Sequence, residues 1–97
     1  MDDALANVAV DLSNRPYCVM HLPEKPVHQS DFDASLTLEF FRAFSQRAGM
    51  NLHVHIVYGT NWHHMVEAAF KGLARALRQA VEMDPRVTGV PSSKGVL

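Results

Sequence analysis

The chain has 97 residues, 47% of them hydrophobic, and a formal net charge of -1 from nine basic and ten acidic residues. This balance gives no basic surface that would attract nucleic acid or an anionic membrane, and no apolar run approaches the roughly 18 residues of a membrane span. A domain this short buries a modest share of its surface, so we expect one domain over residues 1–97 that gains stability from a partner.

Two features of the N-terminal part favour a cytoplasmic protein. The single cysteine, Cys18, lies in an apolar stretch and cannot form an internal disulfide, so we interpret it as a buried thiol in a reducing compartment. The first residues include Asp2 and Asp3 and are acidic, whereas a signal peptide begins with basic residues.

The chain begins with two predicted strands. Residues 5–12 (LANVAVDL) alternate apolar and other side chains with the period of a half-buried strand, and residues 13–16 (SNRP) have turn composition. Residues 17–22 indicate a second strand, so we expect a hairpin.

The next predicted element is a helix of about three to four turns. Residues 23–33 contain two prolines and predict a loop that ends in a capping aspartate, either Asp31 or Asp33. Gly49 stands where a left-handed cap would end the helix. The apolar residues at helical spacing, which we assign to packing, are Leu36, Phe40, Phe41 and Phe44.

Asn51–Tyr58 is the clearest strand in the sequence, because its side chains alternate strictly. One predicted face carries Leu52, Val54, Ile56 and Tyr58, and the other carries His53, His55 and Val57. We interpret the two histidines as structural, although a functional role is the alternative.

A long second helix follows, capped by Thr60 or Asn61 and closed by Pro85. Its apolar stripe is Val66, Phe70, Leu73, Leu77 and Val81. Residues 88–97 are rich in glycine, proline and serine and predict a loop. The element order predicts an α+β fold, a two-layer sandwich (β-β-α-β-α) with two helices on one face of a mainly antiparallel sheet. The helix-free face would need another chain or domain to cover it.

The start of the second helix carries candidate metal ligands in residues 63–67 (HHMVE), followed by Lys71. His63, Glu67 and Lys71 share one helix face, and His64 lies about 100° away around the axis. Imidazole and carboxylate together suit manganese, iron or zinc. Because the two histidines diverge, the spacing suggests two metal positions, each completed from elsewhere. The alternative is a helix start with solvated side chains.

Two weaker candidates complete the set. Ser92, Ser93 and Lys94, followed by Gly95, combine two hydroxyls, a cation and an approachable backbone, which could hold a phosphate; an ordinary tail is the alternative. Glu39 lies in the first helix, either as a surface carboxylate or as a metal ligand.

Several segments in the right order resemble imidazoleglycerol-phosphate dehydratases. They are residues 1–5 (MDDAL), 11–17 (DLSNRPY), 51–54 (NLHV), 63–71 (HHMVEAAFK), 74–77 (ARAL) and 89–97 (GVPSSKGVL). The resemblance covers nearly the whole chain and corresponds to the C-terminal half of a duplicated enzyme. Asn14 stands where the family usually has glycine, His55 where arginine is common, and Trp62 where a smaller residue is found.

The resemblance implies roles for individual residues. His63, His64 and Glu67 would be metal ligands for manganese, with two ions in a complete site, and Glu39 stands where some members place a metal-binding histidine. Glu67 and Lys71 would be catalytic, with Lys71 close to the substrate. Ser92, Ser93 and Lys94 would bind the substrate phosphate.

The resemblance also implies an activity and partners. The enzyme would be a hydro-lyase of histidine biosynthesis that removes water from D-erythro-imidazoleglycerol phosphate to give imidazole acetol phosphate. It would need the N-terminal half and would assemble into a 24-subunit homo-oligomer. Because Met1 matches an interior position of the family, we expect a fragment, a half-gene product or a proteolysed chain.

Two other functional interpretations remain open. In the first, the chain is a non-catalytic metal-binding or structural oligomerisation module. In the second, it shares an α+β fold with ribosomal proteins and binds nucleic acid, which the missing basic surface disfavours.

Overall fold

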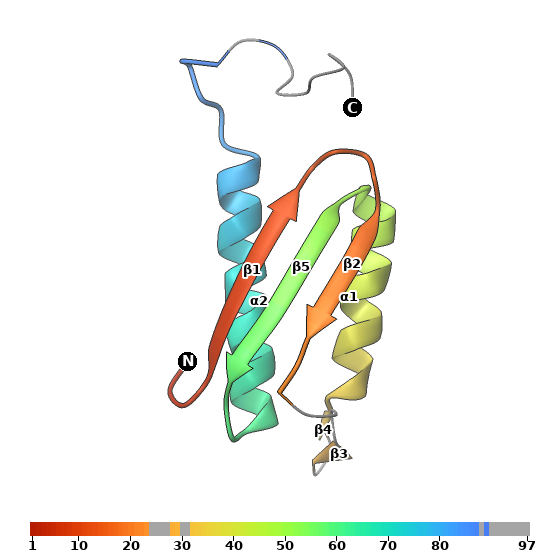
Figure 1. Cartoon of the computed structure of the whole chain (residues 1–97), viewed down its shortest axis with the longest axis vertical. Coiled ribbons are helices and arrows are strands. Elements are labelled where there is room, and N and C mark those ends of the chain that lie inside the picture. Colours follow the sequence, from red (N-terminus) through yellow and green to blue (C-terminus); the bar gives the residue numbers. More distant parts are fainter. Residues whose placement is uncertain (24–27, 30–31, 88, 90–97) are drawn as a thin grey trace.

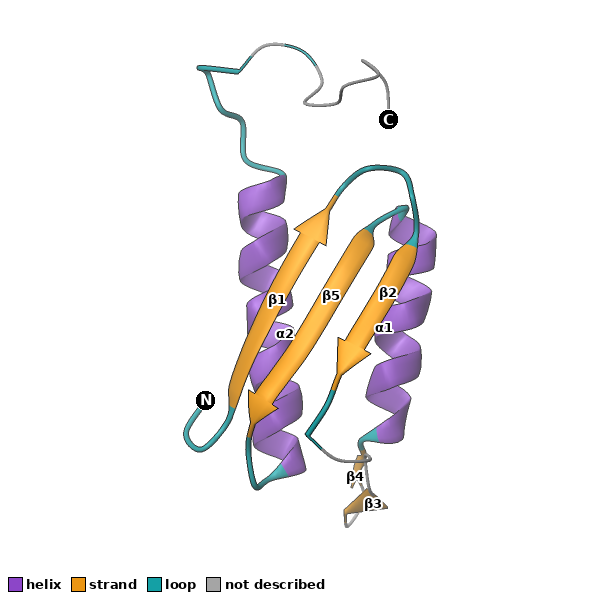
Figure 2. Cartoon of the chain, viewed as in Figure 1, coloured by secondary structure: helices purple, strands orange, loops and turns teal. Residues whose placement is uncertain are grey.

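The computed structural model describes residues 1–23, 28–29, 32–87 and 89. Three strands form a sheet, and both helices lie behind the same face of it, α2 on the side of β1 and α1 on the side of β2 (Figures 1 and 2). The elements are β1 (Leu5–Asp11), β2 (Tyr17–His21), β3 (His28–Gln29), β4 (Phe32–Asp33), α1 (Ser35–Ala48), β5 (Asn51–Tyr58) and α2 (Trp62–Ala80). The α+β class, the two layers and the main order β-β-α-β-α are confirmed. None of the helices in these ranges is long and apolar enough to cross a membrane.

The strand order corrects the predicted hairpin. The order in the sheet is β1-β5-β2, so β5 lies between the two strands that we expected to pair. β5 is antiparallel to β1 and parallel to β2, which makes the sheet mixed rather than mainly antiparallel. Adjacent parallel strands need a long crossover, and α1 supplies it between β2 and β5. The connection between β1 and β2 therefore spans two strand spacings, about 10 Å.

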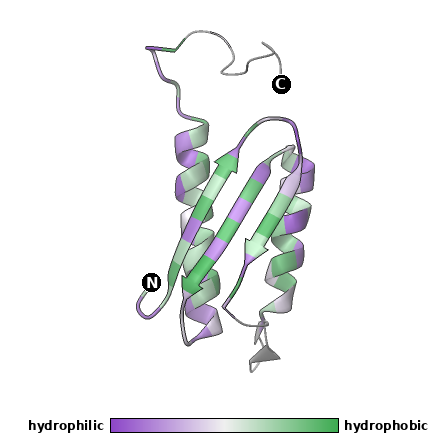
Figure 3. Cartoon of the chain, in the orientation of Figure 1, coloured by the Kyte–Doolittle hydropathy of each residue, from purple (hydrophilic) through white to green (hydrophobic). Residues whose placement is uncertain are grey.

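The core lies between β5 and the helices. Leu52, Val54 and Ile56 of β5 are buried, whereas His53 and His55 point to the open face. The alternation is visible as changing colour along the strands in Figure 3. It confirms the predicted faces of β5 except at its end. Tyr58 is 55% exposed, because the register shifts between the pairs Leu5–Tyr58 and Ala6–Ile56, which leaves Val57 of β5 as the extra residue of a bulge and turns Tyr58 to the other face.

The predicted aspartate cap is not found at the start of α1. The N-cap residue is Ala34, and no side chain caps the helix there. Asp33 lies one residue earlier, where its Oδ1 accepts hydrogen bonds from the backbone N–H (3.0 Å) and hydroxyl (2.5 Å) of Ser35. Asp31 is outside the described residues. Near the other end of α1, the buried Ser45 hydroxyl lies 2.6 Å from the Met50 carbonyl and 3.0 Å from that of Tyr17. This hydroxyl ties α1 to the sheet.

The aromatic residues of the helices are less buried than their spacing predicted. Phe41 is fully buried, but Phe40 and Phe70 are 46% and 38% exposed. These two rings contact each other between α1 and α2, with centroids 5.2 Å apart. Val81 is also exposed, because it lies just beyond the end of α2. An apolar surface therefore remains on the helices.

Gly49 ends α1 in the left-handed conformation that the sequence predicts, with φ 62° and ψ 38°, and its N–H bonds to the Ser45 carbonyl. A Cβ at this position would also lie 2.9 Å from Asn14 Oδ1. We therefore expect Gly49→Ala to lower the free energy of unfolding by about 1–2 kcal/mol, measured by chemical denaturation.

Gly49→Asn is the matched variant, because asparagine tolerates a positive φ but carries the same Cβ. A smaller loss than with alanine would assign the cost to the backbone, and an equal loss would assign it to the contact with Asn14. An unchanged unfolding midpoint in Gly49→Ala would contradict both accounts.

Candidate metal centre

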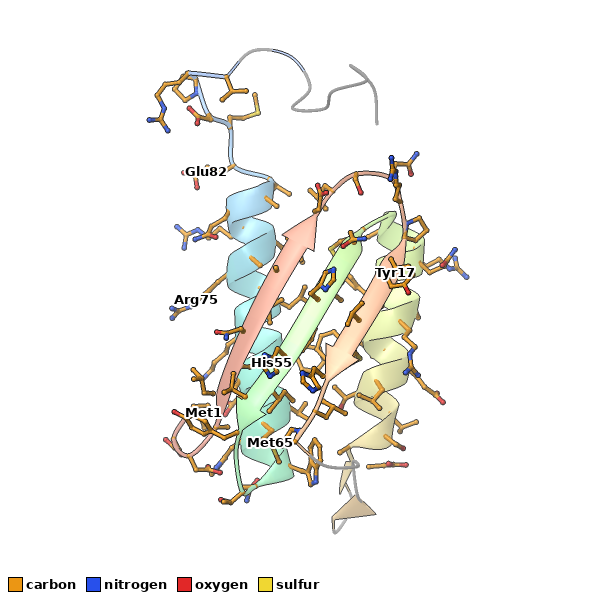
Figure 4. All side chains as sticks on the ribbon, in the orientation of Figure 1. Met1, Tyr17, His55, Met65, Arg75 and Glu82 are labelled. Carbon is orange, nitrogen blue, oxygen red and sulfur yellow. The ribbon has the colours of Figure 1, made fainter. Side chains whose placement is uncertain are left out.

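The candidate ligands lie at one end of the sheet, where segments distant in the sequence meet. Antiparallel pairing places Leu5 of β1 opposite Tyr58 of β5. The residues just before β1 therefore lie beside the turn that leads from β5 into α2. Met1 and Met65 are both labelled at this end in Figure 4. Gly59 leaves room for the Met65 side chain, because a Cβ there would meet Met65 Cγ and lie 2.9 Å from Met65 Sδ.

The first turn of α2 presents the two histidines in different directions. Asn61 is the N-cap, which decides between the two predicted caps, and its Oδ1 accepts a hydrogen bond from the His64 N–H at 3.2 Å. His63 is exposed and His64 is partly buried. Their ring centroids are 6.3 Å apart with planes at 76°. This divergence is the geometry that suggested two metal positions.

Asp3 connects the N-terminal turn to the start of α2. Its Oδ2 accepts hydrogen bonds from the Thr60 N–H (2.7 Å), the Thr60 hydroxyl (2.8 Å) and the Asn61 N–H (3.1 Å). Its Oδ1 lies 2.5 Å from His64 Nδ1. These hydrogen bonds hold the pKa of Asp3 well below its usual value. The bond from the Thr60 N–H has the largest effect, and the bond with His64 has the next largest. Asp3 is therefore an ionised carboxylate at neutral pH.

Glu67 has one carboxylate oxygen without a described partner. Its Oε2 is buried and makes no hydrogen bond within residues 1–23, 28–29, 32–87 and 89, while Oε1 lies 4.0 Å from Lys71 Nζ. Lys71 Nζ also lies 3.7 Å from the sulfur of Met1. A buried carboxylate oxygen without a partner is costly, so a cation bound at Glu67 Oε2 would stabilise this arrangement.

The donor types fit a transition metal, but the described part of the chain does not complete a site. Imidazole and carboxylate are the ligands that manganese, iron and zinc accept. Among the described residues, no three His, Cys, Asp or Glu side chains are grouped to hold a metal ion. Glu39 is exposed on α1 and its ligand role stays a prediction. Ser92, Ser93 and Lys94 lie outside the described residues.

Sequence reasoning missed the two aspartates before β1. Asp3 contacts His64 from 61 positions away, and Asp2, with a positive φ of 46°, has its Oδ2 3.8 Å from His64 Nε2. The signal that could have found them is strand register, because a β1–β5 pair brings the residue before one strand to the residue after the other.

Three other side chains bear on the earlier interpretations. His55 stacks on His21 on the open face of the sheet, with centroids 4.7 Å apart. Cys18 packs against the core, and burial raises the pKa of its thiol. Trp62, the first residue of α2, is 4% exposed, and its indole N–H has no hydrogen-bond partner in the part that the structure describes.

Fold and site together define a class: a two-layer α+β domain with a histidine pair and a carboxylate at the start of a helix. The family model for imidazoleglycerol-phosphate dehydratase matches residues 1–77. The chain belongs to the imidazoleglycerol-phosphate dehydratase family.

Individual relatives agree with this assignment. Over 97 residues the chain is 53% identical to the dehydratase of Geobacter metallireducens and 55% identical to that of Bacillus velezensis. The crystal structure from Staphylococcus aureus matches 87% of the chain with a TM-score of 0.81 and 39% identity, and that from Pyrococcus furiosus matches 100% with 0.80 and 44%. The chain covers 50% of the first two relatives, and 49% and 53% of the two crystallised chains. It therefore spans about half the length of the relatives it matches.

Proposed function

We propose that this chain forms half of a metal-dependent hydro-lyase that converts D-erythro-imidazoleglycerol phosphate to imidazole acetol phosphate in histidine biosynthesis. Family membership over residues 1–77 supports the reaction. The observation that carries the proposal is the buried, unpartnered Oε2 of Glu67, four positions after His63 on the same helix.

In this proposal, His63, His64 and Glu67 hold manganese, with two ions in each complete site. The metal supplies Lewis-acid stabilisation of the charge that develops on the substrate. The exposed Lys71 ammonium, next to the Glu67 carboxylate, binds the substrate and carries a proton at Nζ. Glu39 is a further candidate ligand.

The substrate phosphate is assigned to Ser92, Ser93 and Lys94. Two hydroxyl donors and an ammonium group match the acceptor oxygens and the charge of a phosphate. This part of the proposal is supported by the sequence alone.

The proposal includes partners. The N-terminal half would supply the ligands that the described residues lack, in a cytoplasmic assembly of 24 subunits. Three observations favour a covering partner: the incomplete donor set, the exposed rings of Phe40 and Phe70, and the sheet face without helices (Figure 2).

Metal removal tests the function. We expect a chelator to abolish formation of imidazole acetol phosphate by the assembled full-length enzyme, and Mn²⁺ to restore it. Mg²⁺ should restore little, because it prefers oxygen ligands and keeps its water. Turnover and bound metal would be measured on the same samples.

Two other outcomes separate the alternatives. Stoichiometric Mn²⁺ binding without turnover, in the presence of the N-terminal half, would favour the non-catalytic metal-binding module. Unchanged turnover after complete removal of metal would contradict a metal-dependent mechanism.

A further inference from the structure

The Asp3 carboxylate bridges the N-terminal turn and His64. We propose that Asp3 is a positioning residue that fixes the His64 ring with its Nε2 lone pair available to a metal ion. This inference rests on the proposed function, because it assumes that His64 is a ligand. It adds a residue from outside the helix that carries the histidine pair.

The first step concerns the proton on the His64 ring. An ionised carboxylate can only accept hydrogen bonds, so in the 2.5 Å contact with Asp3 Oδ1 the donor is His64 Nδ1–H. In a neutral imidazole the other nitrogen then carries the lone pair. A carboxylate that accepts the N–H of the ring nitrogen not bound to metal raises the basicity of a metal-binding histidine and fixes its tautomer.

The second step concerns the rigidity of the carboxylate. Its other oxygen, Oδ2, accepts three hydrogen bonds from Thr60 and Asn61, so its orientation does not depend on His64. The His64 backbone is held as well, through the bond from its N–H to Asn61 Oδ1. The ring is thus anchored at its backbone and at Nδ1. The side chains of Asp3 and His64 are each 30% exposed, which limits competition from water.

The third step concerns the other ring nitrogen. The closest approach of Asp2 to His64 Nε2 is 3.8 Å, which is too long for a hydrogen bond. Asp2 therefore leaves this lone pair available. Asp3 holds the ring at Nδ1, and Asp2 lies near Nε2, the nitrogen proposed to bind metal.

The test is Asp3→Asn in the assembled full-length protein, stripped of metal and titrated with Mn²⁺. The amide oxygen can still accept from the Thr60 and Asn61 N–H groups, but the amide NH₂ then faces His64 Nδ1 and donates to it. The proton moves to Nε2, the nitrogen that should bind metal. We expect about 10–100-fold weaker binding of one Mn²⁺ per site, read from the electron paramagnetic resonance signal of free Mn²⁺.

Two variants and one spectroscopic signature separate positioning from a structural role. Asp11→Asn removes the same charge from the exposed end of β1, and Thr60→Val removes one hydrogen bond to Asp3 Oδ2 without touching His64. Asp11→Asn should bind Mn²⁺ like the wild type, and Thr60→Val should weaken binding less than Asp3→Asn does, because two backbone N–H groups still hold Asp3 Oδ2. Solid-state NMR of the metal-free, ¹⁵N-histidine-labelled protein should find His64 protonated at Nδ1 in the wild type and at Nε2 in Asp3→Asn.

The outcomes are distinct. Wild-type affinity in Asp3→Asn, or a wild-type His64 protonated at Nε2, would overturn the inference and leave the proposed function standing. A wild-type protein that binds no Mn²⁺ would instead overturn the proposed metal site. Equal weakening in Thr60→Val and Asp3→Asn would overturn the positioning role in favour of a structural one.

Discussion

In the proposed enzyme, replacing Glu67 with glutamine should remove the manganese and lower turnover by roughly 10³-fold. Its Oε2 is buried without a partner among the described residues, so the carboxylate suits a cation, and a neutral amide does not replace its charge. Loss of metal removes several kcal/mol of charge stabilisation in the transition state, which corresponds to a rate change of this size. Metal analysis and steady-state kinetics on the same preparation measure both effects.

Glu82→Gln is the matched control, since Glu82 is exposed beyond the end of α2. It should keep the metal content and turnover of the wild type. A Glu67→Gln enzyme with full metal content and full turnover would exclude Glu67 as a ligand. Full metal content with lost turnover would instead assign Glu67 to proton transfer.

The largest expected effect on stability comes from Leu52→Ala. Leu52 is fully buried at the centre of the sheet, where β5 pairs it with Val10 on one side and Cys18 on the other. Truncating such a side chain leaves a cavity and costs about 2–5 kcal/mol. Against a total stability of about 5–15 kcal/mol for a typical domain, this loss is large.

Chemical denaturation measures this effect. Glu82→Ala, at an exposed position beyond the end of α2, should change the free energy of unfolding by about 0.5 kcal/mol or less. If the two variants lost equal stability, Leu52 would not be a core residue.

Local patterns in the sequence predicted the three long strands and both helices, but not the two-residue strands β3 and β4, which lie in the predicted loop of residues 23–33. The strand Asn51–Tyr58 has the predicted bounds because strict alternation appears directly in the order of residues. The cap at Asn61 and the left-handed Gly49 follow from local backbone chemistry. Strand order does not, because periodicity shows which side chains share a face and not which strand lies beside another. For this reason, the sequence did not show that β5 lies between β1 and β2, and the predicted hairpin was wrong.

The same limit applies to the candidate site: residues close in the sequence were predicted together, and those joined by strand pairing were missed. His63, His64 and Glu67 were predicted together because a helix brings positions three and four apart onto neighbouring faces. Asp3 was missed because only the pairing of β1 with β5 brings it to the helix. The exposure of Phe40 and Phe70 was missed for a related reason, since helical spacing does not show how far the neighbouring layer extends.

The buried position of Trp62 gives the protein a built-in optical reporter. Trp62 is the only tryptophan in the chain and immediately precedes His63 and His64. Its indole is shielded from water, so its emission should lie toward the blue and shift toward the red if the first turn of α2 opens. The fluorescence of Trp62 can therefore report, without an added label, whether the first turn of α2, which carries His63 and His64, is folded.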